Sequence, residues 1–312
     1  MRFSVESWSP EYGSSIEPGE LEDVSARVDA TVERALADWA PVVPASGARP
    51  DRIMFVDGVR RVDARLWIHD GDRAHPGVCA SVAAGTVECT ASEARVTDWR
   101  VERALVAPAA ADADRAVTRH AVYELVPTVD ADSRAVNLAI HGRMTSLEQR
   151  LAADHACDLV VFDGPLRGRT DPRGVGYVKT QHVQYLPDEV VPVLGRLGDG
   201  ERSPLVLIGE RGAWSRWSWY LRLPGPRSHP LSGVVRCELP GTGRVGDAIT
   251  RADTVSACLP RYASLPHHDA RAPQNLTPIA GLEHRLRHLL GDPVLLERSL
   301  RVAAAAEPRS VL

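Results

Sequence analysis

Two apolar runs in this sequence each end in the dipeptide Asp-Gly. The first run covers 53–56 and precedes Asp57, and the second covers 159–162 and precedes Asp163. Short runs of β-branched and aromatic residues are typical of buried strands, and Asp-Gly is typical of the turn that ends a strand. Two such strands, if they are neighbours in a sheet, bring both carboxylates to the same rim.

The rest of the pattern predicts a mixed α/β protein. Helices are expected over 17–40, 144–155, 187–197, 245–257, 276–290 and 293–305, and strands over 52–57, 59–69, 77–89, 158–162, 174–180, 204–209, 215–223 and 231–239. Asp57-Gly58 falls between the first two strands and predicts a hairpin-like turn or a bulge, while 120–128 fits a strand or a helix. Antiparallel strands, then a helix, then a buried strand is the element order of an RNase H-like core, whose first and fourth strands are neighbours.

Composition limits the classes of function. With 312 residues the chain is long enough for one large α/β domain or two smaller ones. A formal net charge of −4 excludes a broadly basic nucleic-acid binder, so any contact with nucleic acid has to come from local arginine clusters. Lys179 is the single lysine among 37 basic residues, which either reflects a GC-rich genome or marks a site that needs a compact ammonium group.

The cysteines and the N-terminal segment indicate a cellular compartment. The five cysteines are widely spaced and form no CxxC pair, which argues against a disulfide framework or a zinc knuckle and favours a reducing environment. The segment 1–15 is polar and acidic and does not match a signal peptide, and no apolar run approaches the ~20 residues that span a bilayer. A soluble, cytoplasmic protein is therefore expected.

Three carboxylates are candidate metal ligands. Paired carboxylates with arginines nearby suit a divalent metal bound against phosphate, and Asp57 and Asp163 form such a pair. For either Asp-Gly alone, a simple turn is the commoner explanation. Glu148 has two interpretations: the segment 145–148 (TSLE) matches a helix capping box, or the glutamate is a third metal carboxylate on the helix beside the two strands.

Basic and imidazole side chains supply the remaining candidates. Lys179 follows Asp163 at the end of a predicted strand, where it could neutralise charge on a scissile phosphate or position a water. His267 and His268 lie in a predicted turn. They are either metal ligands or surface side chains, and adjacent histidines cannot usually both face one ion. The arginines that could hold backbone phosphates are Arg60, Arg167, Arg169 and Arg173, although a solvated basic loop is the commoner role for each of the last three.

A segment rich in tryptophan and arginine, 209–224, also allows two interpretations. If exposed, it would be a stacking platform for single-stranded nucleic acid. The alternation instead favours a strand whose tryptophans and leucines form a buried face. This leaves Tyr220 and Arg222, on the opposite face, as candidates for contact with nucleic acid.

A dinucleotide site is not supported. The segment 241–246 formally matches GxGxxG, but no second strand ending in an acid follows about 20 residues further on. P-loop, GxSxG and HExxH motifs are absent from the sequence.

Together these segments resemble the NurA nuclease family. The resemblance runs from about residue 50 to residue 292 and is carried by FVDG, by LEQRLA followed by VVFDGPL, by GYVK, and by the late segment SLPHHDARAPQNLTPIAGLEHRLRHLLGD. These motifs stand in the family's order. One departure is Val59, where archaeal relatives tend to have a small polar residue.

The resemblance implies an RNase H-like α/β fold, a mixed central sheet flanked by helices, with an N-terminal helix and C-terminal helical additions. The expected divisions are an N-terminal helix and linker (1–48), a nuclease domain (49–292) and a C-terminal helix and tail (293–312). Carried over by position, the metal ligands would be Asp57, Glu148, Asp163 and His267, with His268 as the alternative histidine, and Tyr220 loosely matches a family tyrosine.

The implied function is manganese-dependent DNA cleavage, with magnesium as the alternative ion, by a homodimer that works with a hexameric HerA-type ATPase in DNA end processing and repair. The expected activity is single-strand endonuclease, 5′–3′ exonuclease or both. The expected catalytic residues are Asp57, Glu148, Asp163, Lys179 and His267, around two divalent ions that activate water and stabilise the leaving oxygen. Two rival functions stay open: a non-catalytic DNA clamp or regulatory partner of a DNA translocase, and a metal-dependent hydrolase of small phosphate esters.

Overall fold

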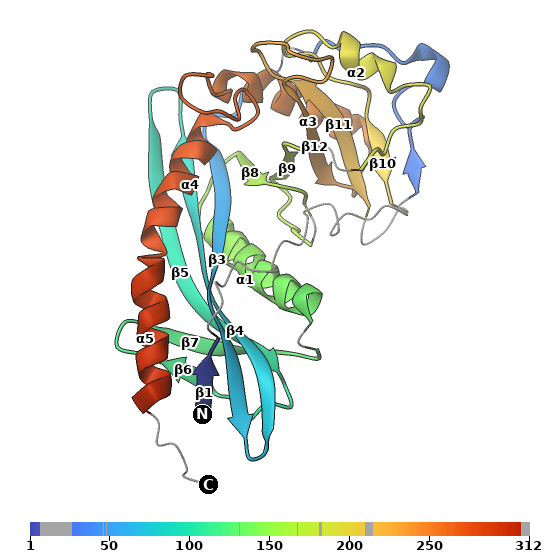
Figure 1. Cartoon of the computed structure of the whole chain (residues 1–312). Helices are drawn as coiled ribbons and strands as arrows, with labels where there is room; N and C mark the ends of the chain where they lie inside the picture. The colour runs from blue at the N-terminus through green and yellow to red at the C-terminus, as the bar shows by residue number, and fades with distance from the viewer. Residues whose placement is uncertain are drawn as a thin grey trace.

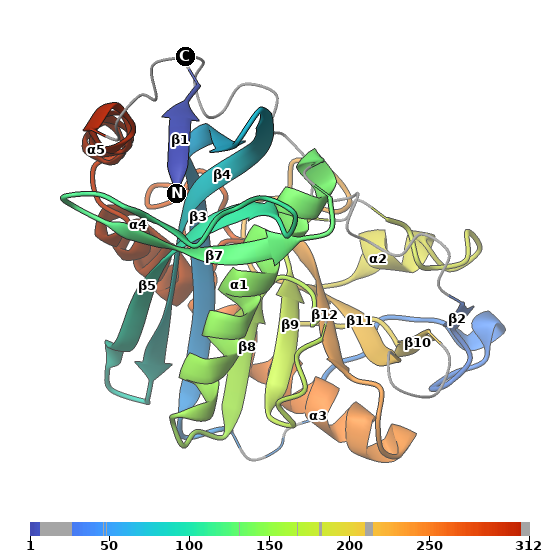
Figure 2. The same ribbon diagram turned by 90° about the horizontal axis from the view of Figure 1, so that it is seen from below.

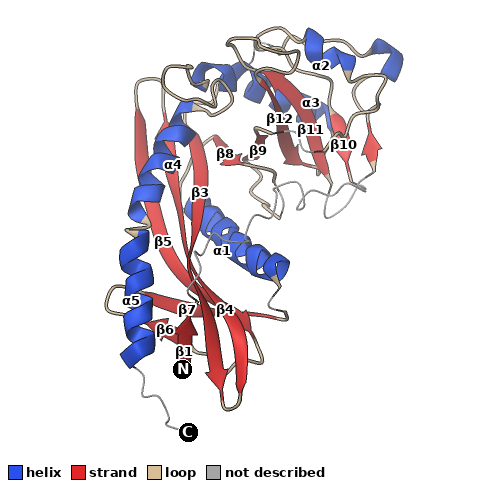
Figure 3. Ribbon diagram, in the orientation of Figure 1, coloured by secondary structure: helices blue, strands red, loops and turns tan. Residues whose placement is uncertain are grey.

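A long, mixed β-sheet organises the structure. The computed structural model describes residues 1–6, 27–45, 47, 49–130, 132–166, 168–180, 183–209 and 215–306. Within these residues twelve strands join into one sheet, which Figure 3 shows with helices on both sides. Proteins of this kind are α/β, so the predicted fold class is confirmed.

The strands follow a defined order across the sheet. Their bounds are β1 (Arg2–Val5), β2 (Val28–Asp29), β3 (Ile53–Asp70), β4 (Arg73–Cys89), β5 (Ala94–Pro108), β6 (Arg115–Val117), β7 (Val122–Thr128), β8 (Leu159–Asp163), β9 (Gly174–Val178), β10 (Val206–Ile208), β11 (Arg216–Arg222) and β12 (Val234–Pro240). The order is β2-β10-β11-β12-β9-β8-β3-β4-β5-β7-β6, with β1 paired to the far end of β3. The segment 120–128, which fitted two interpretations, contains strand β7.

Helices cover both faces of this sheet. Their bounds are α1 (Ser133–Ala153), α2 (Pro192–Arg196), α3 (Val245–Cys258), α4 (Thr277–Leu289) and α5 (Pro293–Ala306). Leu147 and Leu151 of α1 pack with Ala84 on one face, whereas Leu282 and Leu286 of α4 pack in the large core on the other. Figure 2 shows α1 in front of the sheet and α4 behind it. The helices predicted for α3, α4 and α5 are confirmed to within about one residue at each end.

The central part of the sheet has the RNase H-like order. β3, β4 and β5 are consecutive antiparallel strands, α1 follows after the short strands β6 and β7, and β8 then returns parallel to β3. In Figure 1 the three long strands run through the length of the molecule, with α4 and α5 along one side and α1 along the other. The expected neighbourhood of the two Asp-Gly strands is therefore correct.

The expected turn at Asp57-Gly58 is wrong. β3 is one continuous strand of 18 residues, and Asp57 and Gly58 pair with Gly85 and Ala84 of β4. The irregularity in this strand lies later, between Val62 and Ala64. Pairing along the whole of β4 supplies partners for the backbone groups, so no turn is needed. Asp163 does end its strand, because Gly164 has φ of +96°.

The helix expected over 144–155 is longer than predicted. α1 begins at Ser133, and the Asp132 side chain accepts a 2.6 Å hydrogen bond from the Ala135 amide as its N-cap. Glu148 therefore lies in the middle of a helix. The capping-box interpretation of 145–148 is excluded, because the helix does not start there.

The N-terminal segment joins the sheet. The helix expected over 17–40 is not formed in its described part, 27–40, which contains β2 and a short 3₁₀ turn at Leu36–Asp38. Residues 17–26 lie outside the described residues. β2 pairs with β10 and extends that edge of the sheet. None of the helices in the described ranges is both long and apolar enough to cross a membrane.

Candidate active site

A cavity of about 700 Å³ opens where β3, β8 and α1 meet. Its lining contains three acids, Asp57, Glu148 and Asp163, and four cationic side chains, Arg60, Arg169, Lys179 and Arg271. A second cavity of about 330 Å³ shares Asp57, Asp163, Arg60 and Arg271 with the first. The structure thus brings the three predicted carboxylates to one cavity.

The parallel pairing of β3 with β8 places Asp57 beside Asp163. Val56 pairs with Phe162, so the two aspartates occupy the next position on adjacent strands. Asp57 lies on the same face of β3 as Phe55 and Val59, both of which belong to the core that contains α4. Its side chain therefore leaves the sheet on the α4 face.

Glu148 reaches the same cavity from the opposite face. It lies on α1, is 2% exposed, and receives a short hydrogen bond from Arg169. The absence of a side chain at Gly58 makes this approach possible, because a Cβ there would lie 2.5 Å from Glu148 Oε1 and 2.6 Å from Met144 Cγ. The glycine of the first Asp-Gly therefore serves close packing between strand and helix.

Lys179, which Asn275 holds in place, contacts Asp163. Lys179 Nζ donates to Asp163 Oδ2 at 2.7 Å and to Asn275 Oδ1 at 2.7 Å. Asn275 is fully buried and its amide group donates to Asp269. Gln274 Nε2 donates to the Lys179 carbonyl at 3.1 Å. The sequence analysis missed Asn275, and its place in the late RAPQNLTPI segment was the only signal available.

Burial disfavours the charged forms of two of the three carboxylates. Burial raises the pKa of Asp57 well above that of a free aspartate; the Asp163 and Glu148 carboxylates raise it further, against the opposing effects of Lys179 and the Gly58 amide. Burial also raises the pKa of Glu148, although Arg169 acts in the opposite direction. Like charges that share a poorly solvated site favour an added cation.

These residues fit a divalent metal ion in the type of their donor atoms. Asp57 is 6% exposed, and its carboxylate accepts a 2.8 Å hydrogen bond from the Gly58 amide. Oxygen donors of this kind suit magnesium and manganese. Glu148 and Asp163 are at present engaged by Arg169 and Lys179. In the described part of the chain, no three His, Cys, Asp or Glu side chains already converge as a ligand group.

The two histidines lie apart from this cavity lining. His267 and His268 are exposed, and their rings contact each other edge to face with centroids 4.1 Å apart. Neither imidazole lines either cavity. The nearby residues that do are Ala270, Arg271, Ala272 and Gln274. A ligand role for His267 or His268 therefore stays a prediction.

The predicted phosphate-binding arginines have different environments. Arg60 is exposed and lines both cavities. Arg169 is 7% exposed and binds Glu148, so its guanidinium faces an acid of the site. Arg173 pairs with Asp171 at 2.7 Å and donates to two backbone carbonyls near the end of α1, which is a structural role. Arg167 lies outside the described residues.

The prediction that Tyr220 and Arg222 contact nucleic acid is wrong. Both are buried, with 2% and 1% of their surface exposed. β11 lies between β10 and β12, and both of its faces are covered. Arg222 donates to the carbonyl oxygens of Leu194, Pro230 and Ser232. Its guanidinium therefore organises backbone in the interior.

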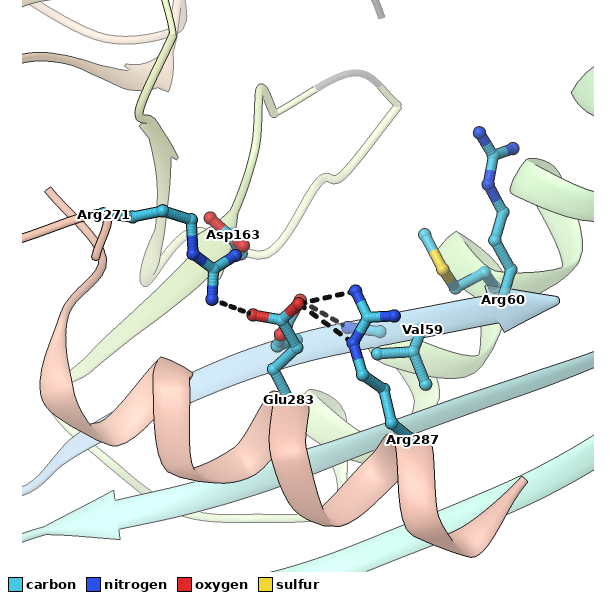
Figure 4. Close-up of a pocket in the computed structure, with 9 residues that line it drawn as sticks. Val59, Arg60, Asp163, Arg271, Glu283 and Arg287 are labelled. Carbon is cyan, nitrogen blue, oxygen red and sulfur yellow. Dashed lines mark hydrogen bonds and ion pairs between the residues drawn. The ribbon is translucent and has the colours of Figure 1, made fainter. Parts of the chain in front are cut away.

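Three further charged residues at the cavity were not predicted. Arg271, Glu283 and Arg287 line the smaller cavity (Figure 4) and form consecutive ion pairs. Glu283 and Arg287 are four residues apart on α4, a common helix pairing that gives no functional signal in a sequence. Only the fold brings them beside Asp57.

Comparison with known proteins bears on the fold. No family model matches the sequence, and no curated protein matches it. The NurA nuclease from Sulfolobus solfataricus is similar in structure over 86% of this chain and 89% of its own, with 13% identity and a TM-score of 0.51. The catalytic domain of human endonuclease V is similar over 79% of this chain and 85% of its own, with 15% identity and a TM-score of 0.32. The chain has a NurA-like fold, as its motifs predicted.

Proposed function

We propose that this chain is a metal-dependent nuclease that hydrolyses phosphodiester bonds of DNA during end processing and repair. The observation that carries the proposal is the position of Asp57 beside Asp163 in a cavity that cationic side chains also line. Carboxylates of this kind hold a metal, and cations beside them accommodate phosphate. The NurA-like fold supports the same reaction class.

Asp57 and Asp163 would hold the metal, and Glu148 would join them after Arg169 releases it. A bound divalent ion, manganese or magnesium, supplies a water of lowered pKa and positive charge for the phosphate oxygens. Lys179 fixes the orientation of Asp163 through the 2.7 Å contact. Its ammonium group also adds positive charge at the cavity wall, where it stabilises negative charge that develops on a phosphate.

The NurA resemblance extends the proposal to partners. It implies a homodimer and an association with a hexameric HerA-type ATPase, and it implies that His267 or His268 takes part in metal binding or proton transfer. Single-strand endonuclease and 5′–3′ exonuclease activity are both part of this proposal. Each of these points rests on the sequence motifs in 50–292.

A non-catalytic DNA clamp is the rival function that a specific observation favours. Arg169 and Lys179 already neutralise two of the three carboxylates. If these pairs never open, the cavity binds phosphate without hydrolysing it. Metal-dependent cleavage therefore separates the two functions.

The test is cleavage of end-labelled single- and double-stranded DNA by the purified chain with manganese, magnesium or EDTA. The proposal expects cleavage with a divalent ion and none with EDTA. DNA binding without cleavage under every condition, also with a HerA-type ATPase present, would favour the clamp. Hydrolysis of bis(p-nitrophenyl) phosphate but of no DNA would favour a small-ester hydrolase.

A further inference from the structure

Glu283 of α4 binds two arginines at once at the edge of the smaller cavity. Arg271 Nη2 lies 2.8 Å from Glu283 Oε2, and Arg287 Nη2 lies 2.8 Å from Glu283 Oε1. Figure 4 shows the two guanidinium groups on either side of this carboxylate, with Asp163 behind them. The arginine side chains are 56% and 67% exposed, whereas that of Glu283 is 13% exposed. The acid is thus sheltered and the bases face solvent.

This arrangement leaves guanidinium N–H donors of two arginines unused beside the carboxylates. One glutamate serves two guanidinium groups, each of which has five N–H donors. Arg271 Nε also forms a long, 3.4 Å ion pair with Asp269, and Arg287 Nε donates a second bond of 3.2 Å to Glu283. Most of the donors of the two arginines therefore remain available to an anion.

Arg60 stands across the same cavity. Within the described residues no carboxylate pairs with it, and its recorded hydrogen bond is a 3.5 Å contact to the Asn137 carbonyl. Although the Arg60 side chain keeps exposed surface, neighbouring atoms partly desolvate its guanidinium and lower its pKa. Figure 4 shows Arg60 on β3, beyond Val59 from the Glu283 pair.

We propose that Arg60, Arg271 and Arg287 bind backbone phosphates of the nucleic-acid strand that enters the carboxylate cavity, with Glu283 fixing the last two. The inference rests on the proposed function and adds the residues that hold the substrate. Arginine is suited to this because its planar fork matches phosphate oxygens. An ordinary helix pair would need Arg287 alone, but here Arg271 is recruited from a separate loop to the same glutamate.

The same lining predicts little sequence preference. Among the described residues, no Phe, Tyr or Trp side chain lines either cavity. Stacking of bases on aromatic rings is the usual way to grip a single strand through its bases. Contact through phosphates alone positions a strand without reading its sequence.

The experiment is titration of a fluorescently labelled oligothymidine with the full chain in EDTA, read by anisotropy at several salt concentrations. The variants are Arg287→Gln and the double change Arg271→Gln with Arg287→Gln. The matched control is Arg285→Gln on the same helix, whose guanidinium lies over the Trp99 ring at 4.5 Å instead. We expect the double variant to bind on the order of tenfold more weakly. Its slope of log Kd against log salt should fall by about 1.4, from about 0.7 per lost phosphate contact.

Equal binding by the double variant, the control and the wild type would overturn the inference, as would a wild type that does not bind. If the double variant fails to fold, the single change at the largely exposed Arg287 tests the same point, with an expected loss of about 0.7 in slope. Cleavage with manganese is scored separately on the same oligonucleotide. If the wild type cleaves DNA and the arginine variants bind the oligonucleotide as tightly as it does, only this inference is rejected. If binding depends on the arginines but no protein cleaves, only the nuclease function is rejected.

Discussion

At the scale of single residues, the site combines acids that the sequence predicted with neighbours that it could not reveal. Asp57 and Asp163 were predicted because each follows an apolar run, and their juxtaposition needs only that the runs be adjacent strands. Arg169 was expected to bind phosphate, yet it pairs with Glu148. The chain between these two residues folds back from α1 through β8, and no local pattern encodes that contact.

Gly58→Ala tests the close approach of α1 to β3. The added Cβ would lie 2.5 Å from Glu148 Oε1, so the glutamate or the helix must move. We expect a loss of about 1–3 kcal/mol in the free energy of unfolding, as for other overpacked sites, together with weaker manganese binding by calorimetry. The control is Gly142→Ala on the exposed side of α1, where nothing lies within 4 Å. That change should leave stability unchanged or raise it by up to about 1 kcal/mol. Equal effects of the two changes would contradict the role of Gly58.

The raised pKa of Asp57 predicts a pH-dependent cost in stability. A carboxyl whose pKa is raised by folding holds its proton more tightly in the folded chain. Its stabilising contribution is present below the unfolded value of 3.8 and is lost as pH rises through the higher folded value. Asparagine has no such proton. Asp57→Asn should therefore gain stability relative to wild type as pH rises from about 4 to about 8, measured by urea unfolding with a chelator present. Parallel stability curves for the two proteins would contradict it.

At the scale of elements, much of the order of strands and helices along the chain was predictable, whereas the ends of some strands were not. Antiparallel strands followed by α1 and β8 were expected because hydrophobic periodicity separates strands from helices, but two of the predicted strands, 52–57 and 59–69, form the single strand β3. β5 has no counterpart among the predicted elements, because its charged residues, such as Arg100 and Glu102, interrupt the alternation. Tyr220 and Arg222 were assigned to an exposed face because alternation cannot show that a strand is covered on both sides.

Gly176 of β9 is predicted to set the position of the loop after Asp163. A Cβ at Gly176 would lie 2.9 Å from the Leu166 amide nitrogen and 3.1 Å from the Gly164 carbonyl oxygen. Glu238 of β12 pairs with Gly176 and accepts from that same Leu166 amide at 2.9 Å. The loop after Asp163 therefore passes close over Gly176, where Glu238 holds it through the Leu166 amide.

Gly176→Ala should therefore shift this backbone and lower cleavage strongly, since a 1 Å displacement of reacting groups can cost about 10²-fold. Oligonucleotide binding in EDTA should change much less. Gly246→Ala in the first turn of α3, with nothing within 4 Å, is the matched control. Wild-type cleavage rates in both variants would show that the loop position does not matter.

At the scale of the whole molecule, the net charge and the continuous sheet bear on how the cavity could work. A net charge of −4 provides no general attraction for DNA, so binding has to depend on the few cations at the cavity. The single sheet links the N-terminal strands β1 and β2 to the core at β3 and β10.

The proposed homodimer gives a direct expectation for mass. One chain has a mass of 33.9 kDa, so light scattering coupled to gel filtration should give about twice this value. The value should persist across the concentrations used for the cleavage assay. A mass of one chain at all concentrations would contradict the dimer but would leave the carboxylate site as proposed.

The most direct test of the central claim compares Asp163→Asn with Asp72→Asn in manganese-dependent cleavage of end-labelled single-stranded DNA. Asp163 lies in the cavity beside Asp57, whereas Asp72 is exposed in the turn between β3 and β4. Both changes remove one carboxylate charge. The account predicts no cleavage above background by the first variant, with its fold intact by circular dichroism, and wild-type cleavage by the second. Full activity of Asp163→Asn with manganese would contradict a metal-dependent nuclease centred on these aspartates.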